Sequence, residues 1–300
     1  MNFNVFHEHF CESKLLCNAD MSEYTSFKVG GAADLMIMPS SACDIKQAIS
    51  LCKSNSIPCF IMGKGSNVLV KDSGFRGVII SLSKGFEKIE QIDDCVIKAE
   101  AGVSLAKLAA FAADVSLAGL EFASGIPGSL GGALYMNAGA YDYDMSGVVL
   151  SAALVDENAN EKVMQAAEMA LGYRTSVFHN AKYVIASCTL KLQPGDKEAI
   201  KAKMLELNNR RKVSQPLELP SAGSTFKRPQ GYYAAKLIDD AGLKGFSIGG
   251  AMVSEKHAGF IVNFNNATAS DILALMEHVK RDVYEKFGVI LVPEVEVLGE

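Results

Sequence analysis

Two glycine-rich segments of the chain have the residue types that suit a bound phosphate group. They are Gly63-Lys-Gly-Ser-Asn67 and Ser124-Gly-Ile-Pro-Gly-Ser-Leu-Gly-Gly-Ala133, and the second segment is expected to run into a helix. Backbone N–H groups can approach an anion where no Cβ intervenes, and a helix that follows adds a favourable dipole. Glycine also marks tight turns, so either segment alone is read equally well as a turn. Together with Met136-Asn-Ala-Gly-Ala-Tyr141, the two segments favour a diphosphate site.

The common nucleotide-binding motifs do not match these segments. The dinucleotide fingerprint Gly-x-Gly-x-x-Gly fails because Val68 stands where the third glycine is required, and apolar β-branched residues follow instead of a helix. No segment has the Gly-x4-Gly-Lys-Ser/Thr pattern of a P-loop. The sequence therefore predicts neither a Rossmann domain nor a nucleoside triphosphatase.

Three other residues have side chains that can take part in acid–base or charge chemistry. The planar guanidinium of Arg174 can bind a carboxylate through two parallel hydrogen bonds. Exposed arginines are common, however, and Ser224 ends the segment Ser-Ala-Gly-Ser, which is typical of a turn. Glu294 reads as an exposed carboxylate at the start of a C-terminal strand. Taken alone, the residue types favour structural roles for Arg174 and Ser224.

Hydrophobic patterns predict how the first 200 residues position these groups. Short apolar runs and alternating patterns indicate strands, and longer amphipathic segments indicate helices. The predicted strands are 34–38, 59–62, 77–81, 88–92, 96–99, 148–155 and 183–192, and the predicted helices are 41–54 and 104–115. The start of the chain thus has a βαβ-like order.

The composition changes after about residue 196. A charged helix is predicted at 197–212, followed by a segment rich in proline, serine and glycine at 214–224. The remainder is predicted to hold helices at 232–241 and 269–287 and strands at 258–263 and 295–298. We expect an α+β region of about 200 residues and a smaller α+β domain after it.

Charge and hydropathy exclude several classes of partner. The net charge of −5 and the absence of a lysine or arginine cluster argue against nucleic acid. No apolar stretch reaches the roughly 18 to 20 residues of a membrane-spanning helix, and the N-terminus has no signal-peptide pattern. A cytoplasmic monomer that does not bind membranes is expected.

The seven cysteines predict no disulfide framework. They are scattered, odd in number and never arranged as Cys-x-x-Cys, so reduced thiols are expected. His7, His9, Cys11 and Cys17 can be drawn as a metal site, but they lack a second ligand pair at a standard spacing. No metal is predicted.

The chain resembles the UDP-N-acetylenolpyruvoylglucosamine reductases, the MurB family. The segments that carry the resemblance follow the family order from about residue 22 to the C-terminus. They are Thr25-Ser-Phe-Lys-Val-Gly-Gly-Ala-Ala-Asp34, Gly63-Lys-Gly-Ser-Asn67, Gly125-Ile-Pro-Gly-Ser-Leu-Gly-Gly-Ala133, Met136-Asn-Ala-Gly-Ala-Tyr141, Gly172-Tyr-Arg-Thr-Ser176, Ser221-Ala-Gly-Ser-Thr-Phe-Lys227, Lys256-His-Ala-Gly-Phe-Ile-Val-Asn263 and Pro293-Glu-Val295.

The resemblance implies an α+β fold of the vanillyl-alcohol oxidase and p-cresol methylhydroxylase type. In that fold two α+β subdomains hold FAD, and a smaller domain covers the substrate. Residues 1–200 are then expected to form the FAD-binding domain, with its subdomains divided near residue 80, and residues 201–300 the substrate-binding domain.

The resemblance also implies a reaction, in which NADPH, through noncovalent FAD, reduces UDP-N-acetylglucosamine enolpyruvate to UDP-N-acetylmuramate for peptidoglycan synthesis. Arg174 would stabilise charge on the substrate carboxylate, Ser224 would donate a proton, and Glu294 would assist at the same carbon. The residues expected to bind the cofactor are Gly63, Lys64, Gly65, Ser66, Asn67, Gly125, Pro127, Gly128, Ser129 and Gly131. Those expected to bind the substrate are Lys227, Arg228, His257 and Asn263, of which His257 and Asn263 could equally be structural.

The chain departs from the longer members of the family in two places. The interval from Arg174 to Ser224 is short and lacks their extra substrate-covering loop, so the chain resembles the shorter type II form. Residues 142–144 replace a Gly-Gly pair that usually follows the tyrosine. Two alternatives remain, another FAD-dependent sugar or alcohol oxidoreductase of the same fold and a non-catalytic relative that binds flavin or a UDP-sugar.

Overall fold

A computed structural model describes residues 2–181 and 183–300 of the chain. The chain forms two units that are each built from separated segments. Unit 1 contains residues 1–17, 35–64 and 77–211, and unit 2 contains residues 18–34, 65–76 and 212–300.

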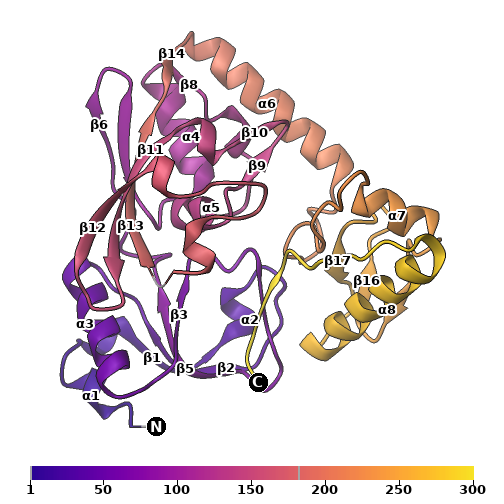
Figure 1. Cartoon of the computed structure of the whole chain (residues 1–300), viewed down its shortest axis with the longest axis horizontal. Helices are drawn as coiled ribbons and strands as arrows, with labels where there is room; N and C mark the ends of the chain where they lie inside the picture. Colours follow the sequence, from indigo (N-terminus) through magenta and orange to yellow (C-terminus); the bar gives the residue numbers. More distant parts are fainter. Residues whose placement is uncertain (1, 182) are drawn as a thin grey trace. The chain divides into compact units, whose positions relative to one another are not determined.

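The main sheet of unit 1 has five antiparallel strands in the order β12-β11-β13-β7-β6 (Figure 1). These strands are β6 (Ile89–Asp93), β7 (Val96–Glu100), β11 (Val149–Asp156), β12 (Glu161–Gln165) and β13 (Tyr183–Lys191). Helix α5 (Leu130–Tyr135) packs against β7 and β13, and α3 (Ala42–Ser54) contacts β11.

A second sheet has the order β1-β2-β5-β3. Its strands are β1 (Leu15–Asp20), β2 (Ala32–Ile37), β3 (Cys59–Met62) and β5 (Phe75–Ser81), and β3 runs parallel to β5. The remaining elements between residues 4 and 214 are α1 (Asn4–His7), α4 (Leu105–Asp114), β8 (Leu117–Ala118), β9 (Gly139–Ala140), β10 (Tyr143–Asp144), β14 (Gln193–Pro194) and α6 (Lys197–Ser214), together with the short helix α2 (Met21–Tyr24) of unit 2. Short 3-10 turns are η1 (Glu12–Lys14), η2 (Glu121–Ala123), η3 (Met145–Gly147), η4 (Ala166–Glu168) and η5 (Val177–His179).

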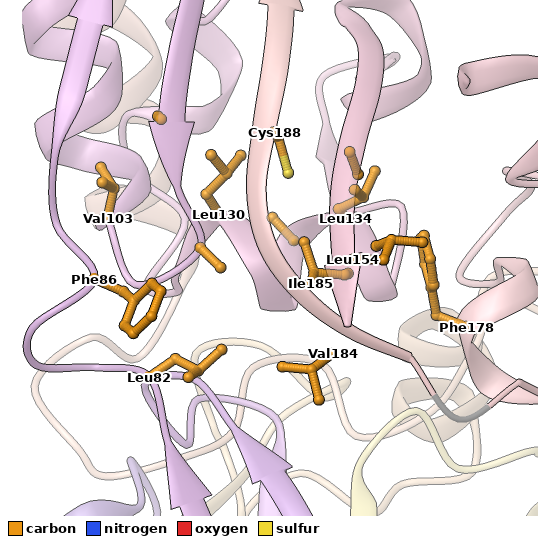
Figure 2. Packing of buried hydrophobic residues seen from close by; sticks show 14 of the residues in the cluster. Leu82, Phe86, Val103, Leu130, Leu134, Leu154, Phe178, Val184, Ile185 and Cys188 are labelled. Carbon is orange, nitrogen blue, oxygen red and sulfur yellow. The ribbon is translucent and has the colours of Figure 1, made fainter. Parts of the chain in front are cut away.

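Apolar side chains from the helices and both sheets fill the core of unit 1 (Figure 2). Leu130 and Leu134 of α5 are completely buried, as is Cys188 of β13. A fully buried leucine side chain contributes roughly 1.5–3 kcal/mol through the hydrophobic effect. Burial also raises the pKa of the Cys188 thiol to about 12, so this cysteine stays protonated and acts as a small apolar residue.

Unit 2 is built on a three-stranded antiparallel sheet covered by two helices. The strands β15 (Ser247–Ile248), β16 (Ala251–Val253) and β17 (Ile261–Asn263) contact α8 (Ala269–Phe287), which also contacts α7 (Ala234–Asp240). A separate parallel pair joins β4 (Val68–Val70) to β18 (Glu296–Leu298), so the strand after the first glycine segment pairs with the C-terminal strand.

Both ends of α8 are capped. At its start, Thr268 and Asp271 form a reciprocal capping box, and Asp72 accepts hydrogen bonds from the backbone N–H groups of Ala269 (2.8 Å) and Ser270 (2.9 Å). Burial opposes the ionisation of Asp72, but these bonds and one from the Ser270 hydroxyl lower its pKa overall. Gly288 ends the helix in the left-handed region, at φ 68°.

Most predicted elements are found within one or two residues of their expected bounds. The helices predicted at 41–54 and 269–287 are confirmed as α3 and α8. The strand predicted at 258–263 is wrong in its first half, because residues 257–260 form a turn closed by the bond from Phe260 N to His257 O (3.0 Å). Only Ile261–Asn263 pair with β16.

Candidate active site

The two glycine segments meet in unit 1 at Gly63 and Ser129. A Cβ added to Gly63, which follows β3, would lie 2.2 Å from the Ser129 hydroxyl oxygen. Such a distance is shorter than van der Waals contact, so any side chain at position 63 would displace Ser129. Ser129 caps the start of α5 by accepting a bond from the backbone N–H of Gly132. The helix predicted after the second segment is therefore confirmed.

Residues 101–105 fix the backbone of the second segment. Leu130 and Gly131 donate their N–H groups to the carbonyls of Val103 and Ala101, each at 2.8 Å, and the Gly128 carbonyl accepts a bond from Leu105 (3.1 Å). The Gly131 N–H is thus engaged within the protein. An added Cβ at Gly131 would lie 2.9 Å from Ala101 Cβ, so close packing accounts for this glycine.

Helix α6 lies against the second segment, a contact that the sequence did not indicate. A Cβ added to Gly125 would lie 2.4 Å from Asn208 Oδ1 and 3.2 Å from Arg211 Cδ. The Tyr141 hydroxyl donates to the Leu207 carbonyl at 2.9 Å. Burial lowers the pKa of Arg211, although a guanidinium stays charged at any physiological pH. One positive charge of α6 therefore lies beside the predicted cofactor segment.

The division between the units falls within the first segment, after Lys64. In unit 2, Gly65 has φ 62°, and an added Cβ would lie 2.1 Å from the Tyr24 carbonyl oxygen. The side chain of Asn67 donates to the backbone carbonyl of Glu294 at 2.9 Å, and the Asn67 carbonyl accepts from Glu296 N at the same distance. Lys64 is exposed and Ser66 is half-buried. Asn67 therefore fixes the backbone that carries the predicted catalytic glutamate.

Arg174 occupies a tight turn in unit 1. Gly172 and Thr175 exchange two backbone hydrogen bonds, of 3.0 and 3.3 Å, around Tyr173 and Arg174. Arg174 has φ 53°, a left-handed conformation that glycine or asparagine usually adopts. Its Nη2 donates to the Gly139 carbonyl at 3.2 Å, and its guanidinium lies 5.1 Å from the centre of the Tyr173 ring.

Two buried side chains anchor this turn to the end of α5 and the residues that follow it. Asn137 donates to the Gly172 carbonyl at 3.0 Å, and Ser176 donates to the Tyr135 carbonyl at 2.6 Å. Asn137 is 2% exposed and Ser176 is 3% exposed. The family resemblance includes Asn137 in the segment 136–141 but predicts no role for it. Its hydrogen-bond partner, Gly172, lies 35 residues away in the sequence.

Ser224 and Glu294 lie on neighbouring backbone segments of unit 2. Glu294 donates its N–H to the Thr225 carbonyl, and Lys227 donates to the Val292 carbonyl, both at 2.8 Å. Phe226 and Pro293 form an antiparallel bridge between these bonds. Ser224 is exposed and Glu294 is half-buried. The backbone thus brings together two of the three predicted catalytic residues.

The predicted substrate residues have different surroundings within unit 2. Lys227 follows the bridge, while the exposed Arg228 places its guanidinium 4.6 Å from the centre of the Tyr233 ring. The Asn263 side chain donates to the Phe27 carbonyl (3.1 Å) and accepts from Ala267 N (2.8 Å). Asn263 therefore has a structural function in this fold.

His257 is a neutral hydrogen-bond acceptor within unit 2. Burial lowers its pKa, and its Nδ1 accepts a bond from the backbone N–H of Gly259 at 3.1 Å. This bond places the ring proton on Nε2, which is then available as a donor.

The N-terminal histidines have separate hydrogen-bond partners. His7 Nδ1 lies 2.8 Å from Glu12 Oε1, and His7 Nε2 lies 3.7 Å from Cys17 Sγ, whereas His9 donates to the carbonyl of Val5. Among residues 2–181 and 183–300, no three histidine, cysteine or acidic side chains are grouped as metal ligands would be. Across the same residues, no helix has the length and apolar character needed to cross a membrane.

Comparisons with known proteins match both parts of the chain. A family model described as an FAD binding domain matches residues 33–165, and one described as the C-terminal domain of UDP-N-acetylenolpyruvoylglucosamine reductase matches residues 215–298. Residues 33–165 thus have the fold of that FAD binding domain.

Curated relatives and a solved structure match nearly the whole chain. The UDP-N-acetylenolpyruvoylglucosamine reductase of Clostridium beijerinckii is 51% identical over 99% of this chain and 97% of its own length. The enzyme of that name from Caldanaerobacter subterraneus is 50% identical over 96% of this chain and 95% of its own length. The crystal structure of the reductase from Thermus caldophilus, MurB, has a TM-score of 0.81 and 33% identity and covers 95% of this chain and 98% of its own. Since identity of this level extends over both parts, the chain belongs to the UDP-N-acetylenolpyruvoylglucosamine reductase family.

Proposed function

We propose that this protein reduces UDP-N-acetylglucosamine enolpyruvate to UDP-N-acetylmuramate, with FAD as its cofactor and NADPH as the reductant, in the synthesis of peptidoglycan precursors. The observation that carries the proposal is the 51% identity to a reductase of that name over 99% of the chain. The backbone pairing of Ser224 and Glu294 and the anchored turn of Arg174 supply side chains for the reaction.

The residues of unit 1 fit an FAD diphosphate. Gly63 and Ser129 leave no space for a side chain between the two segments, so backbone and hydroxyl groups remain as donors. Beside Gly125, the buried Arg211 Nε has no hydrogen-bond partner within the described part of the chain. A buried donor of this kind is satisfied by an anionic ligand. The residues proposed to hold FAD are Gly63, Lys64, Gly125, Pro127, Gly128, Ser129 and Gly131 of unit 1, together with Gly65, Ser66 and Asn67 of unit 2.

The proposed reaction adds a hydride and a proton across the carbon–carbon double bond of the enolpyruvyl group. FAD, when bound, supplies the hydride, because no protein side chain can do so. Negative charge then develops on the substrate towards its carboxylate, where the fork of Arg174 binds and stabilises it. Ser224 donates the proton to the carbon next to the carboxylate, and this transfer is downhill because a carbanion is a strong base. Glu294 orients the substrate at the same carbon.

The substrate diphosphate and sugar are assigned to unit 2. Lys227 and the exposed Arg228 offer two cations beyond Ser224, and the Nε2–H of His257 offers a donor. Asn263 supports this region through its bonds to Phe27 and Ala267.

We further propose a domain division at residue 200. The FAD-binding domain is residues 1–200, with subdomains divided near residue 80, and the substrate-binding domain is residues 201–300. The two family models, which match residues 33–165 and 215–298, support this division because they fall on either side of it. The compact units differ from it, since residues 18–34 and 65–76 belong to unit 2 and unit 1 extends to residue 211. A cytoplasmic location is proposed, since NADPH and nucleotide sugars are cytoplasmic metabolites, and the monomeric state stays a prediction.

An anaerobic visible spectrum of the purified protein tests the function. We expect the visible flavin band to bleach with NADPH and to return when UDP-N-acetylglucosamine enolpyruvate is added. Bleaching without return would indicate a flavoenzyme with another acceptor. A protein that binds FAD but does not bleach would be a non-catalytic relative, and no flavin band after reconstitution with FAD would refute the proposal.

A further inference from the structure

The buried side chain of Asn137 joins two segments around the turn of Arg174. Its Nδ2 donates to the Gly172 carbonyl at 3.0 Å, and its Oδ1 accepts from the backbone N–H of Ser146 at 2.9 Å. Asn137 is 2% exposed and has φ 42°, a left-handed conformation that asparagine tolerates. Both ends of the amide are therefore used, and a residue of another shape cannot make both bonds.

The turn that Asn137 holds is strained at its functional residue. Arg174 adopts φ 53° although it has a Cβ, and such conformations persist only where the surrounding structure fixes them. The backbone direction at Arg174 sets the direction in which its side chain leaves the turn. The restraint on Gly172, two residues earlier, is therefore also a restraint on the guanidinium.

Three bonds to the turn come from one short segment, residues 135–139. Tyr135 accepts from the Ser176 hydroxyl, Asn137 donates to the Gly172 carbonyl, and Gly139 accepts from the Arg174 guanidinium. This segment begins with the last residue of α5, and Ser129 of the second glycine segment caps the start of α5. One helix of six residues thus connects the proposed cofactor segment to the turn of Arg174.

We propose that Asn137 is a positioning residue, which fixes the Arg174 guanidinium relative to the cofactor segment so that it can bind the substrate carboxylate. This inference rests on the role proposed above for Arg174. A displacement of about 1 Å at a reacting group can slow a reaction about 100-fold, so loss of the Asn137 bonds is expected to affect the reaction although Asn137 touches no substrate.

The test uses stopped-flow experiments with the FAD-loaded protein. It measures two half-reactions separately, the reduction of FAD by NADPH and the reoxidation of reduced FAD by the substrate. Asn137→Gly removes the amide and suits the left-handed backbone, and Asn137→Asp keeps the shape but cannot donate to the Gly172 carbonyl. In both variants we expect bleaching by NADPH to stay within about 2-fold of the wild type. Reoxidation at saturating substrate should slow by about 10- to 100-fold.

Asn18→Gly is the matched control, because Asn18 is also an asparagine with a left-handed φ of 49° but is exposed. Both half-reactions of this variant should match the wild type. Flavin content and thermal midpoint of each variant show whether it is folded.

A double-mutant cycle with Arg174→Lys decides between positioning and a general structural effect. If Asn137 acts through Arg174, Asn137→Gly should slow reoxidation by less than about 3-fold in the Arg174→Lys background. If the fold reductions in reoxidation rate of the two single variants multiply in the double variant, the inference is overturned. It is also overturned if Asn137→Gly slows both half-reactions equally. Wild-type reoxidation by Arg174→Lys alone would instead refute the role proposed for Arg174.

Discussion

Glycine and alanine at position 174 should reverse their usual order of stability. At a position with negative φ, alanine is more stable than glycine by about 0.4–1 kcal/mol, because glycine loses more chain entropy on folding. The left-handed conformation costs a residue with a Cβ about 1–2 kcal/mol. Since Arg174 has φ 53°, the second effect exceeds the first. The free energy of unfolding of Arg174→Gly is therefore expected to exceed that of Arg174→Ala by about 0.5–1 kcal/mol.

Urea titration of the two variants measures this difference directly. Both substitutions remove the bond to Gly139 and the contact with Tyr173, so these losses cancel in the comparison. The free energies of unfolding in water are obtained by linear extrapolation with one m-value shared by both variants. Both variants should also reoxidise with substrate about 10²- to 10³-fold more slowly than the wild type, the usual effect of removing a preorganised donor from a developing charge.

Lys203 in α6 is the matched control position for this comparison. It is an exposed helical residue whose ion pair with Glu206 is lost in either variant, and there alanine should be more stable than glycine by about 1 kcal/mol. If alanine is also the more stable residue at 174, the turn is not left-handed at that position, and the strain argument is refuted. If the two variants turn over substrate normally, Arg174 does not bind the carboxylate.

Ser224→Ala should leave bleaching by NADPH nearly intact and slow reoxidation by substrate by about 10²- to 10⁴-fold, as measured by stopped flow; equal loss of both would contradict its role as proton donor. Gly63→Ala should lower the ratio of flavin to protein, because its Cβ displaces Ser129, whereas Gly147→Ala, which has open space, should not; equal flavin content in both would refute the fit of the segment. Asp72→Ala should lower the free energy of unfolding by about 1 kcal/mol at pH 7, since two amides of α8 lose their acceptor. Because the folded-state pKa of Asp72 is lowered, its stabilisation is present above the unfolded-state pKa near 4 and is lost as pH falls through the folded-state pKa, so the difference in unfolding free energy between variant and wild type should shrink as the pH is lowered below about 4.

Local signals in the sequence were sufficient to predict the longer elements. Helix α8 has a periodic apolar face, a capping sequence at Thr268 and a terminal Gly288, so both its bounds could be predicted. The strands of β4 and β15–β17 are only two or three residues long and carry no periodic pattern of their own. β4 pairs with β18, far away in the chain, and residues 258–260 form a local turn, which their apolar composition does not distinguish from the start of β17.

The candidate site could be predicted only in part, for the same physical reason. Family segments indicated Arg174, Ser224 and Glu294, and their catalytic roles remain predictions. The bonds that hold them were not visible, because Asn137 acts on Gly172 across 35 residues and Asn67 acts on Glu294 across 227 residues. Asparagine spacing in a sequence does not specify such partners, and only the fold reveals them.

The pairing of β4 with β18 has a consequence for synthesis of the chain on the ribosome. Residues 68–70 emerge from the ribosome first, and the strand that pairs with them, residues 296–298, emerges only after all the residues between them have been translated. At about 5–20 residues per second, β4 waits on the order of ten seconds or more without its neighbour. Its row of unpaired backbone groups is open to other strands during that interval. Unit 2 therefore cannot complete its folding during translation until residues 296–298 have left the exit tunnel.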